Sequence, residues 1–498
     1  MINKLKFMLV ALITVLSVTS CDMLNEEPKG TLTIDGFYKS LTDLKLSVPA
    51  IPLQFNGAFN QTWGLPYAGD DITSKNSGNK VGFYEVDVFK TNASNDRMPN
   101  WWGYFYSTIK TANPIIVTYE KGETTQEEEA KELIGVAYFY RALSYFFLTR
   151  TWGEVPLNLD GSIMKNRPNA SVQEIYNVIL SDMQKAESML PDNWSAPYKQ
   201  ENTNIFPTKG AAKASLANIY LTMAGWPLKQ TDKYALAAAK AKEVITDKAK
   251  YGFDLEDIHQ LWRKRFTPET VVGCYYNVNI AGWSWENGSQ LGPLSFGCDE
   301  EGGWEDGYGE LTFYNNFPEG PRKDETYQKE YWIERDANGN PTKKVDYTQT
   351  KMKHPFFLKY RYDNMDWTTH QGTNWWGSAT VPIIRYAEVL LTYAEAQAMS
   401  ASPDVSAYAA VNAVRKRAGL EDLPAGMSKE AFRDAVIAER GWEFAGPEAA
   451  ARWFDLLRTE TLAKANKMRH KDENPIDPAN MPDDATHKNY WMPIPINN

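Results

Sequence analysis

The nearest approach to a pair of catalytic carboxylates in this sequence is Glu439 with Glu443, which lie four residues apart and would share one face of a helix. A glycoside hydrolase needs two such groups beside the scissile bond. Arg440 lies between them, however, and more charges follow at Arg452, Asp455 and Arg458. This mixture of signs favours ion pairs that lock the last helices together over an acid/base pair.

Other groups with catalytic potential also lack a catalytic spacing. Asp70 and Asp71 are adjacent, so their side chains point in different directions, which suits hydrogen bonding or a structural turn. The five histidines show no metal-ligand spacing, and there is neither a Gly-x-Ser-x-Gly elbow nor a phosphate-binding loop. We therefore predict that the protein is not an enzyme. A surface glycoside hydrolase whose carboxylates pair in some other way stays open as an alternative.

Aromatic side chains point instead to binding. They make up 13% of the chain, with 17 Trp and 27 Tyr, an excess that leaves many for surfaces that stack on ligands. Sugar rings stack their C–H faces on flat aromatic rings, and their hydroxyls need carboxylate, amide or guanidinium partners. Two irregular, tryptophan-rich segments, 63–95 and 283–376, offer both, although any single tryptophan could belong to the core. The candidate ligand-binding residues are Trp63, Asp71, Tyr84, Trp283, Trp285, Trp304, Tyr308, Trp367, Trp375 and Trp376.

The N-terminus has the features of an exported, lipid-anchored protein. Lys4 and Lys6 precede an apolar run, 7–18, that is too short to span a membrane. Small residues then lead to Cys21, as in a lipobox, and several acyl chains on that cysteine would anchor the protein firmly. We predict a signal peptide at 1–20, lipidation of Cys21 and a tether at 21–35. An ordinary signal peptide with an incidental cysteine is the alternative.

The charge of the chain argues against nucleic acid as a partner. The formal net charge is −10, and removal of residues 1–20 leaves 51 basic against 63 acidic residues, or about −12. Phosphates need a basic face. No long apolar run follows the N-terminus.

The elements that must position the aromatic residues are mostly helical. The most apolar helix is expected at 127–151, and Arg141 within it needs a carboxylate or carbonyl partner if it is buried. Helical hairpins are expected at 211–245 and from Val381 to Gly419, and a last helical pair at 429–445 and 447–465. Such hairpins are the units of α-solenoids. Ser171 with Glu174 predicts a capping box, and Asn338-Gly339 predicts a hairpin turn. Helical periodicity disappears between about 261 and 380. The predicted fold is mainly α, a tetratricopeptide-like helical repeat scaffold (an α-α superhelix) with a long, irregular, loop-rich insertion that contains short strands.

The expected organisation has three parts after the tether. Residues 36–260 form an N-terminal helical region with a binding loop at 60–100, residues 261–380 form a loop-rich ligand-binding insertion, and residues 381–498 form a C-terminal helical-repeat region. Cys274 and Cys298 could pair in an oxidising compartment or stay free.

Four fragments, in this order and spacing, resemble the SusD/RagB family of outer-membrane, surface-exposed nutrient-binding lipoproteins of Bacteroidetes. They are IRYAEVLLTYAEA (384–396), VNAVRKRAG (411–419), ERGWEF (439–444) and RWFDLLR (452–458). The acidic residues Asp22, Glu26 and Glu27 resemble the export signal that sends such lipoproteins to the cell surface. The resemblance also implies tetratricopeptide-like helical pairs and a ligand surface built from loops outside the repeats.

The resemblance implies a non-catalytic glycan-binding protein that delivers oligosaccharides to a SusC-like TonB-dependent transporter. RagB-like relatives handle peptides, so peptide cargo is the nearest alternative, and a helical scaffold without ligand is a third. No cofactor is expected. A bound calcium ion in the acidic, glycine-rich loops stays open, because the sequence shows no coordination motif for it.

Overall fold

The computed structural model describes residues 37–59, 68–162, 167–276, 305–359, 380–446 and 448–496, and the backbone of 365–366 and 371–372. The predicted signal peptide, the lipidation site Cys21 and the tether lie outside these residues. None of the described helices is both long enough and apolar enough to cross a membrane.

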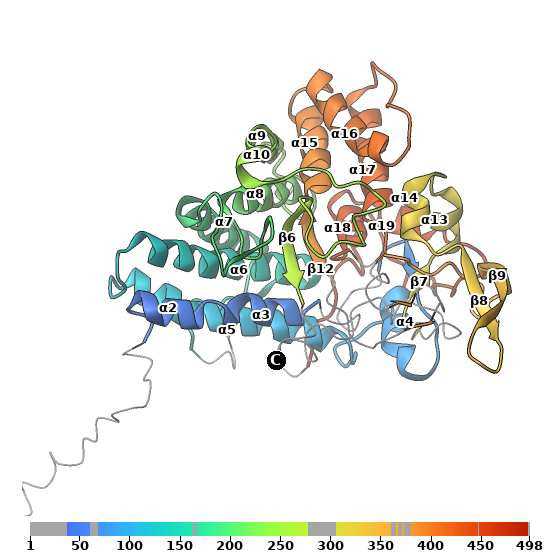
Figure 1. The fold of residues 1–498 in the computed structure, drawn as a ribbon, viewed down its shortest axis with the longest axis horizontal. Helices are drawn as coiled ribbons and strands as arrows, with labels where there is room; N and C mark the ends of the chain where they lie inside the picture. Colours follow the sequence, from blue (N-terminus) through green and yellow to red (C-terminus); the bar gives the residue numbers. More distant parts are fainter. Residues whose placement is uncertain are drawn as a thin grey trace, which may run out of the picture.

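The N-terminal part of the described chain is a stack of helices. Its long helices pack in sequence order, α5 on α6, α6 on α7, α7 on α8 and α8 on α9, and rise from the base of the molecule in Figure 1. The helices are α2 (Leu41–Ser47), α3 (Ala50–Gly57), α4 (Val81–Asp87), α5 (Met98–Glu120), α6 (Glu128–Trp152), α7 (Val172–Met189), α8 (Lys209–Ala224), α9 (Lys233–Thr246) and α10 (Lys248–Tyr251).

The C-terminal helices continue the same stack. Helix α15 (Tyr386–Ser400) packs on α8 and α9, and α16 (Val405–Arg417) and α17 (Lys429–Glu443) pack on α15. Two short helices follow, α18 (Ala451–Arg458) and α19 (Leu462–Asn466), where the sequence predicted one helix at 447–465. The predicted tetratricopeptide-like repeat scaffold is confirmed.

Local signals explain where several of these helices begin. Ser171 and Glu174 form the predicted capping box of α7, in which each side chain bonds the other residue's backbone N–H. The side chain of Asp404 caps α16 by accepting from the N–H of Ala407 at 2.9 Å. Near the N-terminus, α2 ends at Ser47 and α3 begins at Ala50, so the segment that contains Pro49 is not one long helix.

The prediction that a helix begins at Val381 is wrong. Residues Thr380–Arg385 form strand β12, which pairs antiparallel with β6 (Thr270–Tyr275), and the helix begins only at Tyr386. The segment is rich in β-branched residues, which favour strands. Its partner strand is distant in sequence, so the apolar run alone did not distinguish a short buried strand from the first turn of a buried helix.

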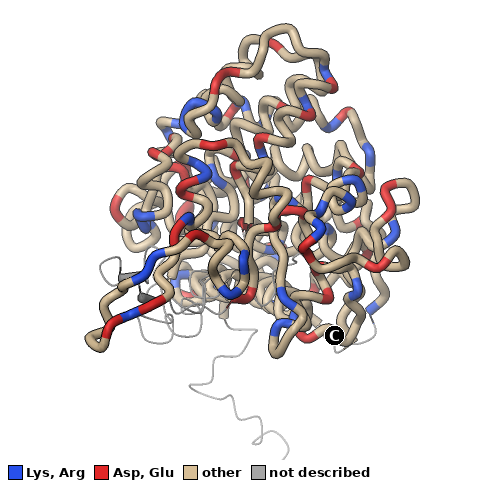
Figure 2. The backbone as a smooth tube through the Cα atoms, turned by 90° about the vertical axis from the view of Figure 1, so that its right-hand side faces the viewer, with Lys and Arg blue, Asp and Glu red and all other residues tan. Residues whose placement is uncertain are grey.

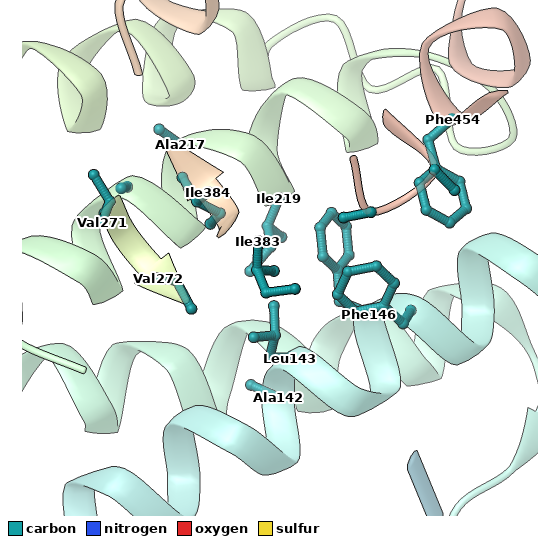
Figure 3. Packing of buried hydrophobic residues seen from close by; sticks show 14 of the residues in the cluster. Ala142, Leu143, Phe146, Ala217, Ile219, Val271, Val272, Ile383, Ile384 and Phe454 are labelled. Atoms are coloured by element: carbon teal, nitrogen blue, oxygen red, sulfur yellow. The ribbon is translucent and has the colours of Figure 1, made fainter. Parts of the chain in front are cut away.

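Strand β12 lies among helices, and all of its residues except Thr380 are buried. Figure 3 shows Ile383 between Ile219 of α8 and Leu143 of α6, with Ile384 beside Ala217. All of these side chains are at most 8% exposed. The two-stranded sheet therefore lies within the helical core and connects the insertion to the repeat scaffold.

The insertion contains short strands, as predicted, and also short helices. Helices α13 (Leu311–Asn316) and α14 (Pro321–Thr326) precede the hairpin of β8 (Glu330–Arg335) and β9 (Pro341–Asp346), which projects from the right-hand side in Figure 1. The predicted Asn338-Gly339 turn is confirmed, with Gly339 at φ +85°. The 60–100 segment is more regular than its glycines suggested, because it contains the short η4 (Gly78–Lys80) and α4. Figure 2 shows acidic and basic residues interspersed along the backbone.

Candidate functional site

Two short strands join the two segments that the sequence singled out for ligand binding. Strand β1 (Ile72–Thr73) pairs antiparallel with β7 (Tyr308–Gly309). The N–H of Glu310 donates to the carbonyl of Asp71 at 3.2 Å. The Ser74 hydroxyl also donates to the carbonyl of Asp306 at 2.7 Å. We call this contact the β1–β7 junction. Its strands begin a few residues after residue 68, where the described chain resumes after 60–67, and after residue 305, where it resumes after 277–304.

The other ends of the same segments also lie close together. The Tyr276 hydroxyl donates to the carbonyl of Asn56 at 2.8 Å, and the Asn56 amide donates to the carbonyl of Tyr275 at 3.3 Å. Thr380 pairs with Tyr275 in the β6–β12 sheet. The described residues just before segments 60–67 and 277–304 therefore lie close together, and so do the described residues that follow these segments, at the β1–β7 junction. Thr380, which follows the segment 373–379, lies beside the first of these two places.

Asp71 fixes the junction to the C-terminal helices. Its carboxylate is 2% exposed and accepts from the N–H of Gly446 at 2.6 Å. Gly446 has φ +82°, and a Cβ there would lie 2.5 Å from the ring of Phe357, so both the backbone conformation and the close approach require glycine. The neighbouring Asp70 points elsewhere and forms a two-pronged ion pair with Arg452 at 2.6 and 2.7 Å. The prediction that these aspartates are hydrogen-bonding, structural residues is confirmed.

Burial, reinforced by the charge of Asp70, raises the pKa of Asp71 to about 7, against an ordinary value of 3.8. The folded state therefore prefers the protonated carboxyl. The stabilisation this gives is complete below the ordinary pKa and is lost as the pH rises through about 7.

Replacing Asp71 by asparagine should remove this pH dependence. The amide resembles the protonated carboxyl and can still accept from the N–H of Gly446. The free energy of unfolding of Asp71→Asn relative to the wild type should therefore rise by on the order of 2–4 kcal/mol between about pH 4 and about pH 8. Urea unfolding across this range measures it, with Asp232→Asn, whose side chain is 70% exposed, as the control. A difference that does not change with pH would contradict the assignment.

Tyr308 lies inside the junction, 4% exposed, with its ring 4.5 Å from the ring of His354. The Nδ1 of His354 lies 2.6 Å from the carbonyl of Met352, and its Nε2 lies 3.1 Å from a carboxylate oxygen of Glu473. Both partners accept, so this geometry suits a doubly protonated ring. Burial alone would lower the pKa of His354, but the hydrogen bond and charge of Glu473 raise it overall. Here Tyr308 supports the junction through packing.

Of the remaining candidate residues, only Tyr84 belongs to the part of the chain that the structure describes. Tyr84 lies half-buried in α4, within the 60–100 segment. The predicted ligand-binding tryptophans and the lipidation site lie outside the described residues, so their assignments stay predictions; they are Trp63, Trp283, Trp285, Trp304, Trp367, Trp375, Trp376 and Cys21. The structure brings together the attachment points of segments 60–67 and 277–304, and it places the end of the segment before Thr380 beside Tyr275.

The Glu439–Glu443 pair is part of a buried charge cluster. Glu439 is 0% exposed and binds Arg322 at 2.6 Å and Arg415 at 2.7 Å. Glu443 is 2% exposed and binds Arg322 and Arg385 at 3.1 and 2.6 Å. Burial alone would raise the pKa of Glu443, but its arginine partners hold it well below the usual range. The predicted role as a charge network is confirmed, since both carboxylates are buried and bound by arginines.

This arginine–glutamate cluster was only partly visible in the sequence. It also includes four residues that no spacing in the chain connects: one just before β6, one in the segment after β9, one at the end of α16 and one in the loop before α18. They are Glu269, Lys359, Arg417 and Glu448. Among the described residues no group of three or more His, Cys, Asp and Glu side chains could hold a metal ion. Cys274 is a fully buried, free thiol.

Comparison with known proteins gives the family. A model described as the SusD family matches residues 275–498, and one described as starch-binding associating with outer membrane matches residues 41–221. The SusD-like protein P2 of Formosa agariphila is 26% identical over 98% of this chain and 96% of its own.

Solved structures show the same fold. A SusD homolog from Bacteroides thetaiotaomicron superposes with a TM-score of 0.72 at 21% identity, covering 87% of this chain and 89% of that one. A laminarin-binding SusD-like protein superposes with a TM-score of 0.68 at 23% identity, covering 92% of this chain and 99% of that one. The two family matches together cover most of both helical parts of the chain and the 275–380 segment between them, and on this evidence the protein belongs to the SusD/RagB family.

Proposed function

We propose that this protein is a non-catalytic, cell-surface glycan-binding lipoprotein that captures oligosaccharides or polysaccharides and delivers them to a SusC-like TonB-dependent transporter. The observation that carries the proposal is the convergence of the attachment points of the tryptophan-rich segments at the β1–β7 junction and at Asn56, Tyr275 and Tyr276. Segments held at shared points can present their aromatic rings on one surface.

Two further facts support a glycan as the ligand. Seven of the 17 tryptophans of the chain are candidate ligand-binding residues in the two irregular segments, 63–95 and 283–376, where they could supply stacking surfaces; they are Trp63, Trp283, Trp285, Trp304, Trp367, Trp375 and Trp376. One solved relative is named for laminarin binding, and a matching family model is described as starch-binding. Each stacked aromatic ring would contribute on the order of 1 kcal/mol beyond its buried area.

The non-catalytic part of the proposal rests on the carboxylates. Glu439 and Glu443 are held by arginines, Asp70 by Arg452, and Asp71 by the N–H of Gly446. Each of these carboxylates already has a structural partner. Lipidation at Cys21 would place the protein on the outer face of the outer membrane, where the helical repeats would face the transporter and the aromatic segments would capture the ligand.

Affinity electrophoresis through gels loaded with single polysaccharides tests the proposal. The full chain, in a detergent without a sugar headgroup, should be retarded by one polysaccharide of a panel that includes starch and laminarin. Trp283→Ala or Trp304→Ala should weaken this retardation about tenfold, because each removes a stacking platform. Tyr119→Ala, which removes a half-buried aromatic ring from the end of α5, is the matched control and should leave retardation unchanged.

Three results would count against the proposal. Retardation that survives both tryptophan substitutions would place the site elsewhere. Tight binding of peptides in a calorimetric titration, with no binding of sugars, would favour the RagB-like alternative. Release of reducing ends from the retarding polysaccharide would show a glycoside hydrolase.

A further inference from the structure

A cavity of about 340 Å³ opens between α13, α17, α18 and α19. Its volume lies within the range of small-molecule sites. Helix α17 contributes Asp434, Ala438 and Trp442 at a spacing of four residues, which places them on one face of that helix. The opposite face, which includes Phe432 and Val436, is buried in the core. Helix α17 therefore has a second, partly apolar face, which borders this cavity.

The cavity combines a flat aromatic surface with unused polar groups. Trp442 is half-buried, and within the described structure its indole N–H has no hydrogen-bond partner and its ring contacts no other ring. The exposed amide of Asn316, on the α13 side, is likewise unpaired there. The Asp70–Arg452 ion pair forms another edge, with side chains 15% and 13% exposed, so both keep some capacity for further hydrogen bonds.

The charges at the cavity argue for a neutral ligand. Three acidic lining residues balance three basic ones, so the cavity has no net charge; they are Asp70, Glu310 and Asp434 against Arg452, Lys464 and Arg469. Asp70 is paired with Arg452, and Arg469 with Asp87. An anionic ligand would therefore find little uncompensated positive charge, whereas a ring with an apolar face and a hydroxylated edge would match Trp442 on one side and the polar groups on the other.

We propose that this cavity binds a neutral pyranose residue and forms a second glycan subsite, separate from the predicted tryptophan surface. The sugar would stack on Trp442 and hydrogen-bond to Asn316 and the Asp70–Arg452 pair. The choice of sugar as the ligand class rests on the proposed function. The cavity lies beside the β1–β7 junction, because Asp70 lines the cavity while Asp71 fixes the junction.

Fluorine NMR of the full chain labelled with fluorotryptophan tests the subsite directly. The Trp442 resonance is assigned by its loss in Trp442→Phe. Methyl β-glucopyranoside, methyl α-mannopyranoside, methyl β-galactopyranoside and methyl β-xylopyranoside are the probes, each titrated to its solubility limit in a detergent without a sugar headgroup. At least one should shift this resonance saturably, and Asn316→Ala should weaken that binding about threefold to tenfold. The resonances of Trp332 and Trp491, which do not line the cavity, should stay in place.

A Trp442 resonance that none of the four glycosides moves would overturn the subsite, as would shifts that do not saturate or that Trp332 and Trp491 share. The readout is independent of the polysaccharide assay. If the subsite alone is wrong, retardation in polysaccharide gels persists and remains sensitive to Trp283→Ala or Trp304→Ala. If the proposed function alone is wrong, retardation is absent while the Trp442 resonance still responds to a simple glycoside.

Discussion

Replacing Arg385 by methionine should lower the free energy of unfolding by about 3–5 kcal/mol or prevent folding, the largest effect we expect for a single side chain. Arg385 is 2% exposed at the end of β12, immediately before α15. Its guanidinium binds Glu269 at 2.5 Å, Glu443 at 2.6 Å and Glu448 at 2.8 Å. Methionine fills similar space but removes the one cation that the three carboxylates share. Glu269, Glu443 and Glu448 would keep only Arg417, Arg322 and Lys359 as partners, and burying carboxylates with too little compensating charge is strongly unfavourable.

Urea unfolding, followed by far-ultraviolet circular dichroism, measures the effect. The matched control is Lys343→Met in the β8–β9 hairpin, which breaks the pair with Glu334 where both side chains are more than half exposed. That change should cost less than about 1 kcal/mol, because water screens exposed ion pairs. Arg385→Lys should be intermediate, since lysine keeps the charge but cannot serve three carboxylates in one plane. Equal losses in Arg385→Met and Lys343→Met would refute the central role of Arg385.

Breaking the Arg141–Asp182 pair between α6 and α7 should have the second largest effect, and a double replacement should reverse most of it. Arg141 donates to both carboxylate oxygens of Asp182, at 2.7 and 2.9 Å, and to the side-chain carbonyl of Asn113 at 3.1 Å. Both members of the pair are at most 4% exposed. Arg141→Met alone should cost about 3–5 kcal/mol, because it leaves the Asp182 carboxylate buried and unpaired.

The double variant Arg141→Met, Asp182→Leu should recover most of that loss, since two apolar side chains of similar volume need no partner. Asn113 still donates to the carbonyl of Asn158 at 2.9 Å, so its amide group keeps one of its contacts. The four proteins of this cycle, compared by urea unfolding, separate the ion pair from packing. If the double variant were as unstable as the sum of the two single variants, packing and not charge would be the source of the loss.

The sequence alone determined the helical scaffold, because its signals are local. The apolar periodicity of 127–151 and the capping box at Ser171 depend on residues a few positions apart, and the structure confirms both within about one residue. The sequence also indicated that Arg141 needs a buried partner. A cation within so apolar a helix requires a buried partner, although the sequence did not show that Asp182 would supply it.

Local patterns also predicted that four candidate carboxylates have structural partners. The arginine between and after Glu439 and Glu443 indicated ion pairs, and the structure shows both carboxylates bound by arginines. The adjacency of Asp70 and Asp71 indicated different directions for their side chains, and they bind Arg452 and Gly446 respectively. The sequence therefore predicted those features of the carboxylates that depend on residues close to them in the chain.

Only the tertiary structure decided which distant residues meet. Thr380–Arg385 is a strand because β6, more than a hundred residues earlier, offers its edge, and Trp442 faces a cavity because α13 and α19 leave one there. The β1–β7 junction pairs Ile72 with Gly309 for the same kind of reason. Periodicity and capping record the interactions of a residue with its near neighbours in the chain, whereas these contacts form only when the core excludes water from segments far apart in sequence.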